Sequence, residues 1–251
     1  MKFLRPLLVA CVLLALWEAL VRALEIPAFI LPPPSRVAVA LVANAELLAR
    51  NAGVTALEIL LGLILGTAMG CASGLTLVRF GAARRLLLPV LIASQAVPVF
   101  ALAPLLVLWL GYGLASKIAM AALVIYFPVA SAFYDGLRRT EPGWLELAQT
   151  MQARPMAVLL QIRLPAALPA LGSGLRVAAA VAPIGAVIGE WVGASAGLGY
   201  LMTLSLARAQ TDLAFAALTI LAVLGLALFY AVDFGLRRLI PWQRESVAQS
   251  D

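Results

Sequence analysis

The chain has 251 residues, of which 64% are hydrophobic and only 12% are charged. A soluble domain of this length is about half apolar and about a quarter charged. The composition and the mean hydropathy of +1.03 therefore exclude a soluble globular protein and indicate a polytopic membrane protein. The formal net charge of +6 does not indicate nucleic-acid binding, because the arginines form short clusters between apolar runs.

Missing residue types exclude several kinds of catalytic and metal site. The chain has no histidine, which removes His-dependent triads and most zinc sites. Cys11 and Cys71 both lie inside apolar runs, which favours small buried residues over a disulfide or a metal site. Residues 111–117 have Ser116 where a phosphate-binding loop needs its second glycine. We therefore expect no metal, no cofactor and no enzymatic activity in this chain, so that any ATP binds to a partner subunit.

Six apolar runs approach the roughly 20 residues that a helix needs to cross a bilayer. A signal peptide is the alternative for the first run, but Trp17, Glu18 and Arg22 follow its apolar core and no small-residue cleavage site is evident. We therefore expect an uncleaved first helix and a single all-α transmembrane domain over residues 1–251. The predicted spans are residues 6–24, 54–78, 86–110, 115–135, 171–192 and 213–236.

The basic residues predict the orientation of these spans, because cytoplasmic loops carry an excess of lysine and arginine. The majority side holds Lys2, Arg5, Arg79, Arg84, Arg85, Arg138, Arg139, Arg154, Arg163, Arg176, Arg237, Arg238 and Arg244. The other side holds only Arg22, Arg36, Arg50, Lys117 and Arg208. Both termini and the loop of about residues 136–170 are therefore expected in the cytoplasm. The external segment 25–51 contains Ser35, a candidate N-cap for a short surface helix.

Two stripes of glycine at four-residue spacing predict close helix packing. In lipid, small residues that let backbones approach are the main aid to helix association. Packing within one chain and packing between two copies are both compatible with the pattern. The stripes are Gly62, Gly66, Gly70 and Gly74 in the second span, and Gly185, Gly189, Gly193 and Gly197 in the fifth span and its extension.

Prolines and isolated polar residues mark candidates for the lining of a transport pathway. Pro98 and Pro104 interrupt the third span, and Gln95 lies one turn before Pro98. Each proline frees a backbone carbonyl, which is tolerated where protein or a water-lined cavity satisfies it. A kink that only shapes packing is the alternative. Glu190 has no local basic partner, and both gating and anchoring at the membrane interface beside Trp191 fit that position.

The long polar loop between the fourth and fifth spans has a patterned sequence. Trp144, Leu145, Ala148 and Met151 recur at helical spacing and give a short helix one apolar face. Such a helix docks a partner or lies on the inner leaflet. Glu146-Leu147-Ala148 is followed by three residues, Gln152, nine residues and Ile162-x-Leu164-Pro165.

This spacing resembles the E-A-A-x3-G-x9-I-x-L-P signature of ABC importer permeases. The segments LPPPSRV, VPVFALAPLLVLWLGYG and GEWVGASAGLGYLM resemble the nitrate/sulfonate/taurine branch of that family, so the resemblance covers nearly the whole chain. Within the branch, the runs SQAVPVFALAPLL, SKIAMAALVIYFPVASAFYDGLRRTEPGW and APIGAVIGEWVG look most similar to permeases for thiamine-precursor pyrimidines.

The resemblance implies a type I ABC importer permease fold in a bacterial inner membrane. It implies a pathway for a small polar solute, with a thiamine-precursor pyrimidine expected and sulfonate, taurine or nitrate as alternatives. The implied partners are cytoplasmic ATPase subunits, an external solute-binding protein, a second permease copy and lipid, with no nucleic acid. An ATP-independent secondary transporter is less favoured, because the carboxylates lie mainly near span ends. The residues expected to couple to the ATPase are Glu146, Leu147, Ala148, Gln152, Ile162, Leu164 and Pro165.

Two residues depart from the signature. Leu147 replaces an alanine, and Gln152 replaces the glycine between the two short helices. If that position needs a positive φ, glutamine costs about 1 kcal/mol or more relative to glycine. Pro155 suits the first position of a second helix, so a helix–turn–helix is still expected.

Overall fold

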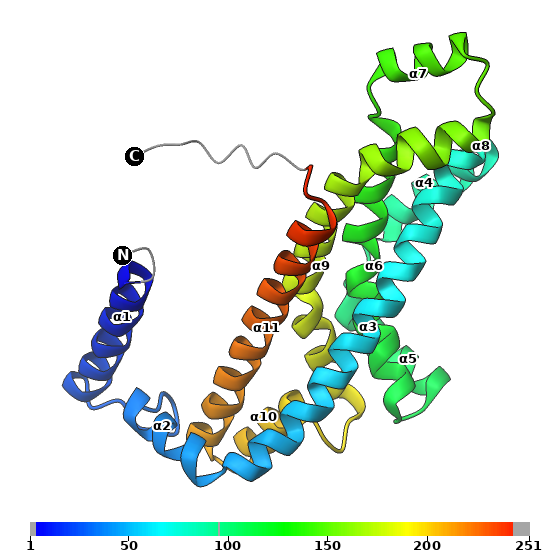
Figure 1. The fold of residues 1–251 in the computed structure, drawn as a ribbon. Coiled ribbons are helices and arrows are strands. Elements are labelled where there is room, and N and C mark those ends of the chain that lie inside the picture. Colours follow the sequence, from blue (N-terminus) through cyan, green and yellow to red (C-terminus); the bar gives the residue numbers. More distant parts are fainter. Residues whose placement is uncertain (1–3, 95, 243–251) are drawn as a thin grey trace.

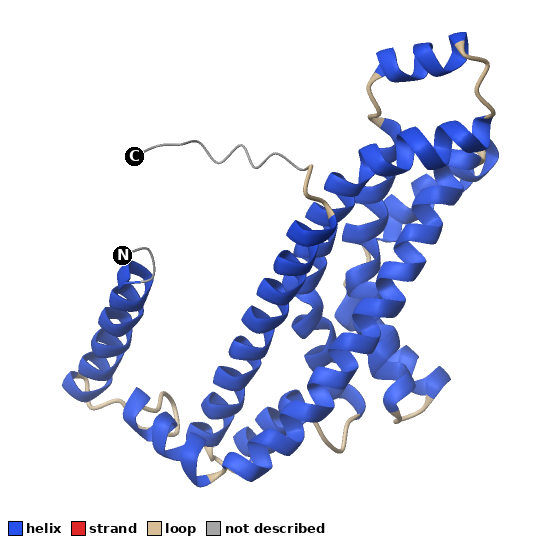
Figure 2. Cartoon of the chain, viewed as in Figure 1, coloured by secondary structure: helices blue, strands red, loops and turns tan. Residues whose placement is uncertain are grey.

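The computed structural model describes residues 4–94 and 96–242, and every regular element within those residues is a helix (Figure 2). Four helical stretches are long and apolar enough to cross a membrane: Ala45–Arg79, Leu114–Arg138, Pro155–Gly193 and Thr211–Leu239. The expected all-α polytopic fold is confirmed, while the limits of the six predicted spans stay predictions. The elements in chain order are α1 (Leu4–Ala23), α2 (Pro34–Ala43), α3 (Ala45–Arg79), α4 (Gly81–Ser94), α5 (Val99–Leu110), α6 (Leu114–Arg138), α7 (Pro142–Thr150), α8 (Pro155–Val158), the π-helical turn η1 (Leu159–Arg163), α9 (Leu164–Gly193), α10 (Leu198–Ala207) and α11 (Thr211–Leu239).

The core of the molecule is a block of three long helices, α3, α6 and α9 (Figure 1). Helix α7 projects beyond one end of this block, and α10 lies at the opposite end. Helix α11 runs obliquely beside α9, whereas α1 stands apart along most of its length and contacts the rest through α2 and through Trp17, which packs against Phe215 of α11. The two ends of the block therefore carry different short helices.

The glycine stripe of α3 faces α6, and all four of its glycines are buried. A methyl group added at Gly66 would lie 2.8 Å from the carbonyl oxygen of Ala122, and one at Gly70 would lie 2.8 Å from a methyl of Val129. Only glycine permits this backbone approach, as expected for helices packed without a hydrophobic driving force. In this structure the stripe is used within one chain.

The second glycine stripe is shorter than the sequence pattern predicts. Gly185 and Gly189 pack against α6, and Gly193 packs against Val107. Gly197 lies beyond the end of α9, in the turn before α10, with a φ of 115°. The prediction that Gly197 continues the helical stripe is therefore wrong, because the chain has already left the helix at that point.

The predicted third span, residues 86–110, is interrupted between α4 and α5, as Pro98 indicates, because proline has no N–H and disfavours helix in the residue before it. One further local prediction needs correction. In the segment of residues 25–51, Pro33 rather than Ser35 holds the N-cap position of α2. The Ser35 backbone N–H and hydroxyl instead donate hydrogen bonds to the carboxylate of Glu18, which also pairs with Arg22 as expected.

Candidate functional site

Helix α7 is presented at the end of the block with most of its apolar side chains exposed (Figure 1). Pro142 occupies its first turn, where a missing N–H does no harm. Trp144 and Met151 are 52% and 74% exposed, and only Ala148 of the predicted apolar face is buried. An apolar helix face that the chain itself leaves uncovered is suited to contact with another surface.

Gln152 ends α7 in a left-handed conformation, with a φ of 50°. Its N–H donates to the carbonyl of Gln149, and the N–H of Ala153 donates to the carbonyl of Ala148, both at 2.9 Å. This pair of bonds is the Schellman motif, whose left-handed residue is usually glycine. The conditional expectation of a positive φ at this position is therefore met, and glutamine bears the conformational cost.

The remaining residues of the signature lead directly into the long helix α9. Pro155 begins α8, as expected, and Ile162 lies in the π-helical turn η1. Leu164 and Pro165 begin α9. Helices α8, η1 and α9 follow one another without an intervening loop, so residues Pro155–Gly193 form one continuous helical stretch.

A groove of about 930 Å³ lies between α7 and the start of α9. Its wall includes Trp144, Leu147, Ala148, Ile162, Pro165 and Trp242. Glu146, which precedes the groove-lining Leu147 on α7, is exposed, and its carboxylate has no hydrogen bond or ion pair to any residue that the structure describes. Four of the seven predicted signature residues therefore line one groove: Leu147, Ala148, Ile162 and Pro165.

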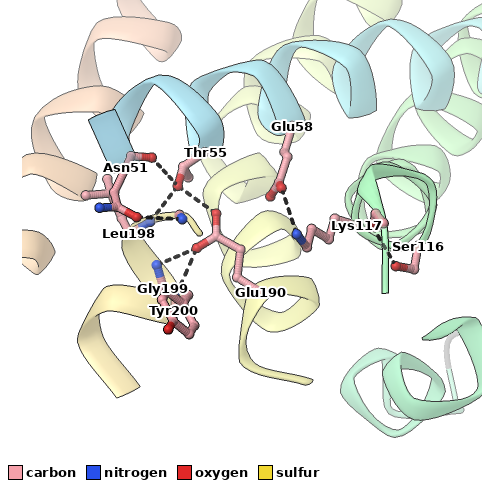
Figure 3. Close-up of polar contacts among 11 residues, drawn as sticks. Asn51, Thr55, Glu58, Ser116, Lys117, Glu190, Leu198, Gly199 and Tyr200 are labelled. Carbon is pink, nitrogen blue, oxygen red and sulfur yellow. Dashed lines mark hydrogen bonds and ion pairs between the residues drawn. The ribbon is translucent and has the colours of Figure 1, made fainter. Parts of the chain in front are cut away.

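A second polar cluster lies buried near the opposite end of the block, and Figure 3 shows it in close-up. Glu190, on α9, is only 1% exposed. Its Oε1 accepts a hydrogen bond from the Thr55 hydroxyl at 2.6 Å, and its Oε2 accepts the N–H groups of Gly199 and Tyr200 at 2.5 and 3.2 Å. Interfacial anchoring of Glu190 is therefore not what the structure shows, although the adjacent Trp191 is 55% exposed.

One turn further along α3, Glu58 faces Lys117 of α6 (Figure 3). The Lys117 Nζ lies 3.5 Å from a carboxylate oxygen of Glu58, and both side chains are buried. Neither buried oxygen of Glu58 has a hydrogen-bond partner in the described residues. Glu58 lies in the interior of α3, which begins at Ala45.

The predicted lining of a transport pathway stays a prediction. Gln95 lies outside the described residues, Pro98 precedes α5, and Pro104 is an exposed residue within α5. Glu190 is buried in the cluster described above. Sequence reasoning missed Asn51 and Thr55, although Asn51, Thr55 and Glu58 recur at helical spacing and mark one polar face of α3.

Comparison with known proteins establishes the family. Residues 49–245 match the family described as binding-protein-dependent transport system inner membrane component. The chain belongs to that family. A probable ABC transporter permease protein of Haemophilus influenzae is 54% identical over 239 residues, which cover 95% of this chain and 98% of the relative.

Two further relatives have substrates in their names. The formylaminopyrimidine transport permease protein ThiX of Halalkalibacterium halodurans is 35% identical over 96% of this chain and 97% of its own length. The riboflavin transport system permease protein RibX of Chloroflexus aurantiacus is 36% identical over 92% and 87%. Permeases named for aliphatic sulfonates and taurine are also similar to this chain, which agrees with the branch predicted from sequence.

A solved chain of the MetNI methionine ABC transporter in inward-facing conformations shares the fold, with a TM-score of 0.66 and 20% identity over 80% of this permease and 97% of that chain. The permease is thus a multi-pass inner-membrane subunit of an ABC importer and is not an enzyme. ATP is bound by a partner ATPase subunit.

Proposed function

We propose that residues 136–170, the coupling loop, dock α7 and its following turn on the cytoplasmic ATPase. The observation that carries this proposal is the exposed, unpaired Glu146 on α7, a helix whose residues Leu147 and Ala148 line the groove between α7 and α9. A basic or N–H group on the partner surface that becomes buried on docking would pair with the Glu146 carboxylate. Trp144 and Met151 would make apolar contacts with the same surface. Leu147, Gln152, Ile162, Leu164 and Pro165 would shape or support this surface.

Exchange of Glu146 tests the docking. We expect Glu146→Ala and Glu146→Lys to reduce co-purification of the ATPase subunits and ATP-dependent uptake at least tenfold, because a contact to a charged group is worth about 1.5–3 kcal/mol. Glu46→Ala is the matched control, since it removes an exposed carboxylate at the far end of the block. Normal association and uptake in both Glu146 variants would disprove this role of the loop.

We further propose a thiamine-precursor pyrimidine as the substrate, with two copies of the permease enclosing the pathway and both termini in the cytoplasm. The proposal is supported by the pyrimidine-type sequence runs and by the similarity to ThiX over nearly the full length of both chains. Gln95, Pro98 and Pro104 are the proposed pathway residues. Riboflavin is the second candidate, because RibX is 36% identical.

The substrate is tested with the complex of permease, ATPase and external binding protein. We expect a formylated or hydroxymethylated aminopyrimidine to raise the melting temperature of the binding protein and to drive uptake in proteoliposomes. Taurine, nitrate and riboflavin serve as matched negative ligands. Stabilisation and uptake with riboflavin, taurine or nitrate instead of the pyrimidine would refute the substrate assignment while leaving the coupling proposal standing.

A further inference from the structure

The N-terminus of α10 is held entirely by side chains from other helices. The first four N–H groups of a helix have no partner within the helix. In α10 these groups belong to Gly197, Leu198, Gly199 and Tyr200. All four donate to side chains of α3 or α9 at distances of 2.5 to 3.2 Å (Figure 3).

Three residues provide these acceptors, and together we call them the α10 clamp: Asn51, Thr55 and Glu190. The Asn51 Oδ1 accepts the N–H of Gly197 and the Thr55 hydroxyl accepts the N–H of Leu198, both at 2.8 Å. The Glu190 carboxylate accepts the remaining two N–H groups and also accepts a hydrogen bond from the Thr55 hydroxyl. The carboxylate additionally complements the positive end of the helix dipole.

The clamp lies where separation of its parts is costly. Asn51, Thr55 and Glu190 are all buried, with Thr55 completely excluded from solvent. Opening the clamp would leave several N–H groups and a carboxylate without partners in a region shielded from water, where such groups are strongly disfavoured. The contacts are therefore suited to persist rather than to break during each transport cycle.

The clamp connects to a block that is closely packed along its length. Gly136 and Gly174 bring α6 and α9 together near the coupling loop, and Gly185 and Gly189 do so near the clamp. At each of these positions an added methyl group would lie 2.6 to 3.1 Å from an atom of the facing helix. The backbones of α6 and α9 are therefore in close contact at these positions, with no space for an added side-chain atom.

We infer that Asn51, Thr55 and Glu190 are positioning residues that fix α10 to the α3–α6–α9 block, so that movement of the coupling loop displaces α10 as part of one rigid unit. This inference rests on the proposed docking of the coupling loop. Without the clamp, α10 would be held by the turn of residues 194–197 and by apolar contacts, such as those of Leu198 and Leu201 with the start of α11, and its N-terminal N–H groups would have no fixed partners on α3 or α9.

A matched pair of substitutions at Thr55 tests the positioning role. Thr55→Val keeps the shape of the side chain but removes the acceptor for Leu198 and the donor to Glu190, whereas Thr55→Ser keeps both. We expect uptake per assembled complex to fall at least tenfold in Thr55→Val and to stay within twofold of wild type in Thr55→Ser. In both variants, the ATPase subunits should co-purify and basal ATP hydrolysis should stay within twofold of wild type.

The outcomes separate positioning from general folding. Normal uptake per assembled Thr55→Val complex would overturn the inference, as would equal loss of uptake in both variants. Failure of the wild-type permease to co-purify with the ATPase would instead contradict the proposed docking of the coupling loop. Co-purification therefore tests the docking separately from the positioning role of Thr55.

Rigidity is tested by crosslinking across the clamp. Val54 on α3 and Leu204 on α10 line the same pocket, so cysteines at both positions, in a background with Cys11 and Cys71 replaced by alanine, can be joined by a short reducible bifunctional reagent. We expect the crosslinked complex to keep at least half of its uptake. Uptake that is abolished by crosslinking and restored by reduction would show that α3 and α10 separate during transport, which would overturn the inference.

Discussion

At the scale of single residues, two positions show how the same backbone demand is met differently. Gln152 adopts a left-handed conformation in the coupling loop with an ordinary side chain. Gly197 adopts a positive φ in the turn before α10, where it also lies against the Glu190 carboxylate. The first site tolerates a non-glycine residue because its side chain is exposed, whereas the second has no room for one.

Replacing Gln152 by glycine should stabilise the turn between α7 and α8. Glycine adopts positive φ without the steric cost that a Cβ imposes, which is about 1 kcal/mol or more. We expect amide hydrogen exchange at residues 148–155 to slow about fivefold, because opening of this turn becomes less favourable. Gln152→Ala keeps the Cβ and should not slow exchange, and equal slowing in both variants would contradict the explanation.

Gly197→Ala should disrupt the α10 clamp. The backbone conformation there, with φ 115° and ψ 163°, is accessible essentially only to glycine, and an added methyl group would overlap the Glu190 carboxylate. We expect a loss of at least about 2 kcal/mol in stability, measured as a lower thermal unfolding midpoint in detergent. Gly53→Ala is the control, because its added methyl group meets no atom within 4 Å and alanine favours helix.

At the scale of elements, the block depends on glycine faces that bring helices together. Four glycines of α3 point at α6, and their neighbours Ala122, Ile125, Val129 and Phe133 fill the space between the helices. Since lipid is as apolar as the side chains, the gain from this contact comes from close packing. The contact is therefore sensitive to added volume.

Gly66→Ala should push α3 and α6 apart. Its methyl group would lie 2.8 Å from a backbone oxygen of Ala122, which cannot rotate away as a flexible side chain can. Overpacking of this kind costs about 1–3 kcal/mol, so the thermal unfolding midpoint should fall. Gly235→Ala on α11 adds the same group in open space and should not lower the midpoint. An unchanged midpoint for Gly66→Ala would contradict close packing at this position.

At the scale of the whole molecule, the coupling loop and the α10 clamp occupy opposite ends of one helical block (Figure 1). Most of the arginines lie at the end of the block that carries the coupling loop. The charge distribution predicts that the coupling-loop end faces the cytoplasm. The same prediction puts the proposed ATPase contact and α10 on different sides of the membrane.

Cysteine labelling tests that orientation. In a background with Cys11 and Cys71 replaced by alanine, Arg50→Cys and Arg154→Cys place exposed thiols at opposite ends of the block. A membrane-impermeant maleimide should label Arg50→Cys in intact spheroplasts and Arg154→Cys only after permeabilisation, because only the first thiol faces outward. The reverse pattern would show that the chain is inserted the other way round.

Much of the function was predictable because it depends on local sequence. Apolar runs long enough for a bilayer indicate the membrane fold, and the spacing from Glu146 to Pro165 indicates the permease family. The interruption of the helix within residues 86–110 was predictable from Pro98. The interrupted glycine stripe was not, because four-residue spacing continues through Gly197 although the helix does not.

The sequence by itself determined that the chain lies in a lipid bilayer, that its fold is all-α and where the signature loop lies. Hydropathy, helix period and signature spacing are all properties of residues close together in the chain. Only the tertiary structure decided the partners of Glu190. Its carboxylate is satisfied by Thr55, which is 135 residues away, and by the N-terminus of α10. Such a pairing depends on how α3, α9 and α10 pack, and the residues adjacent to Glu190 in sequence carry no sign of it.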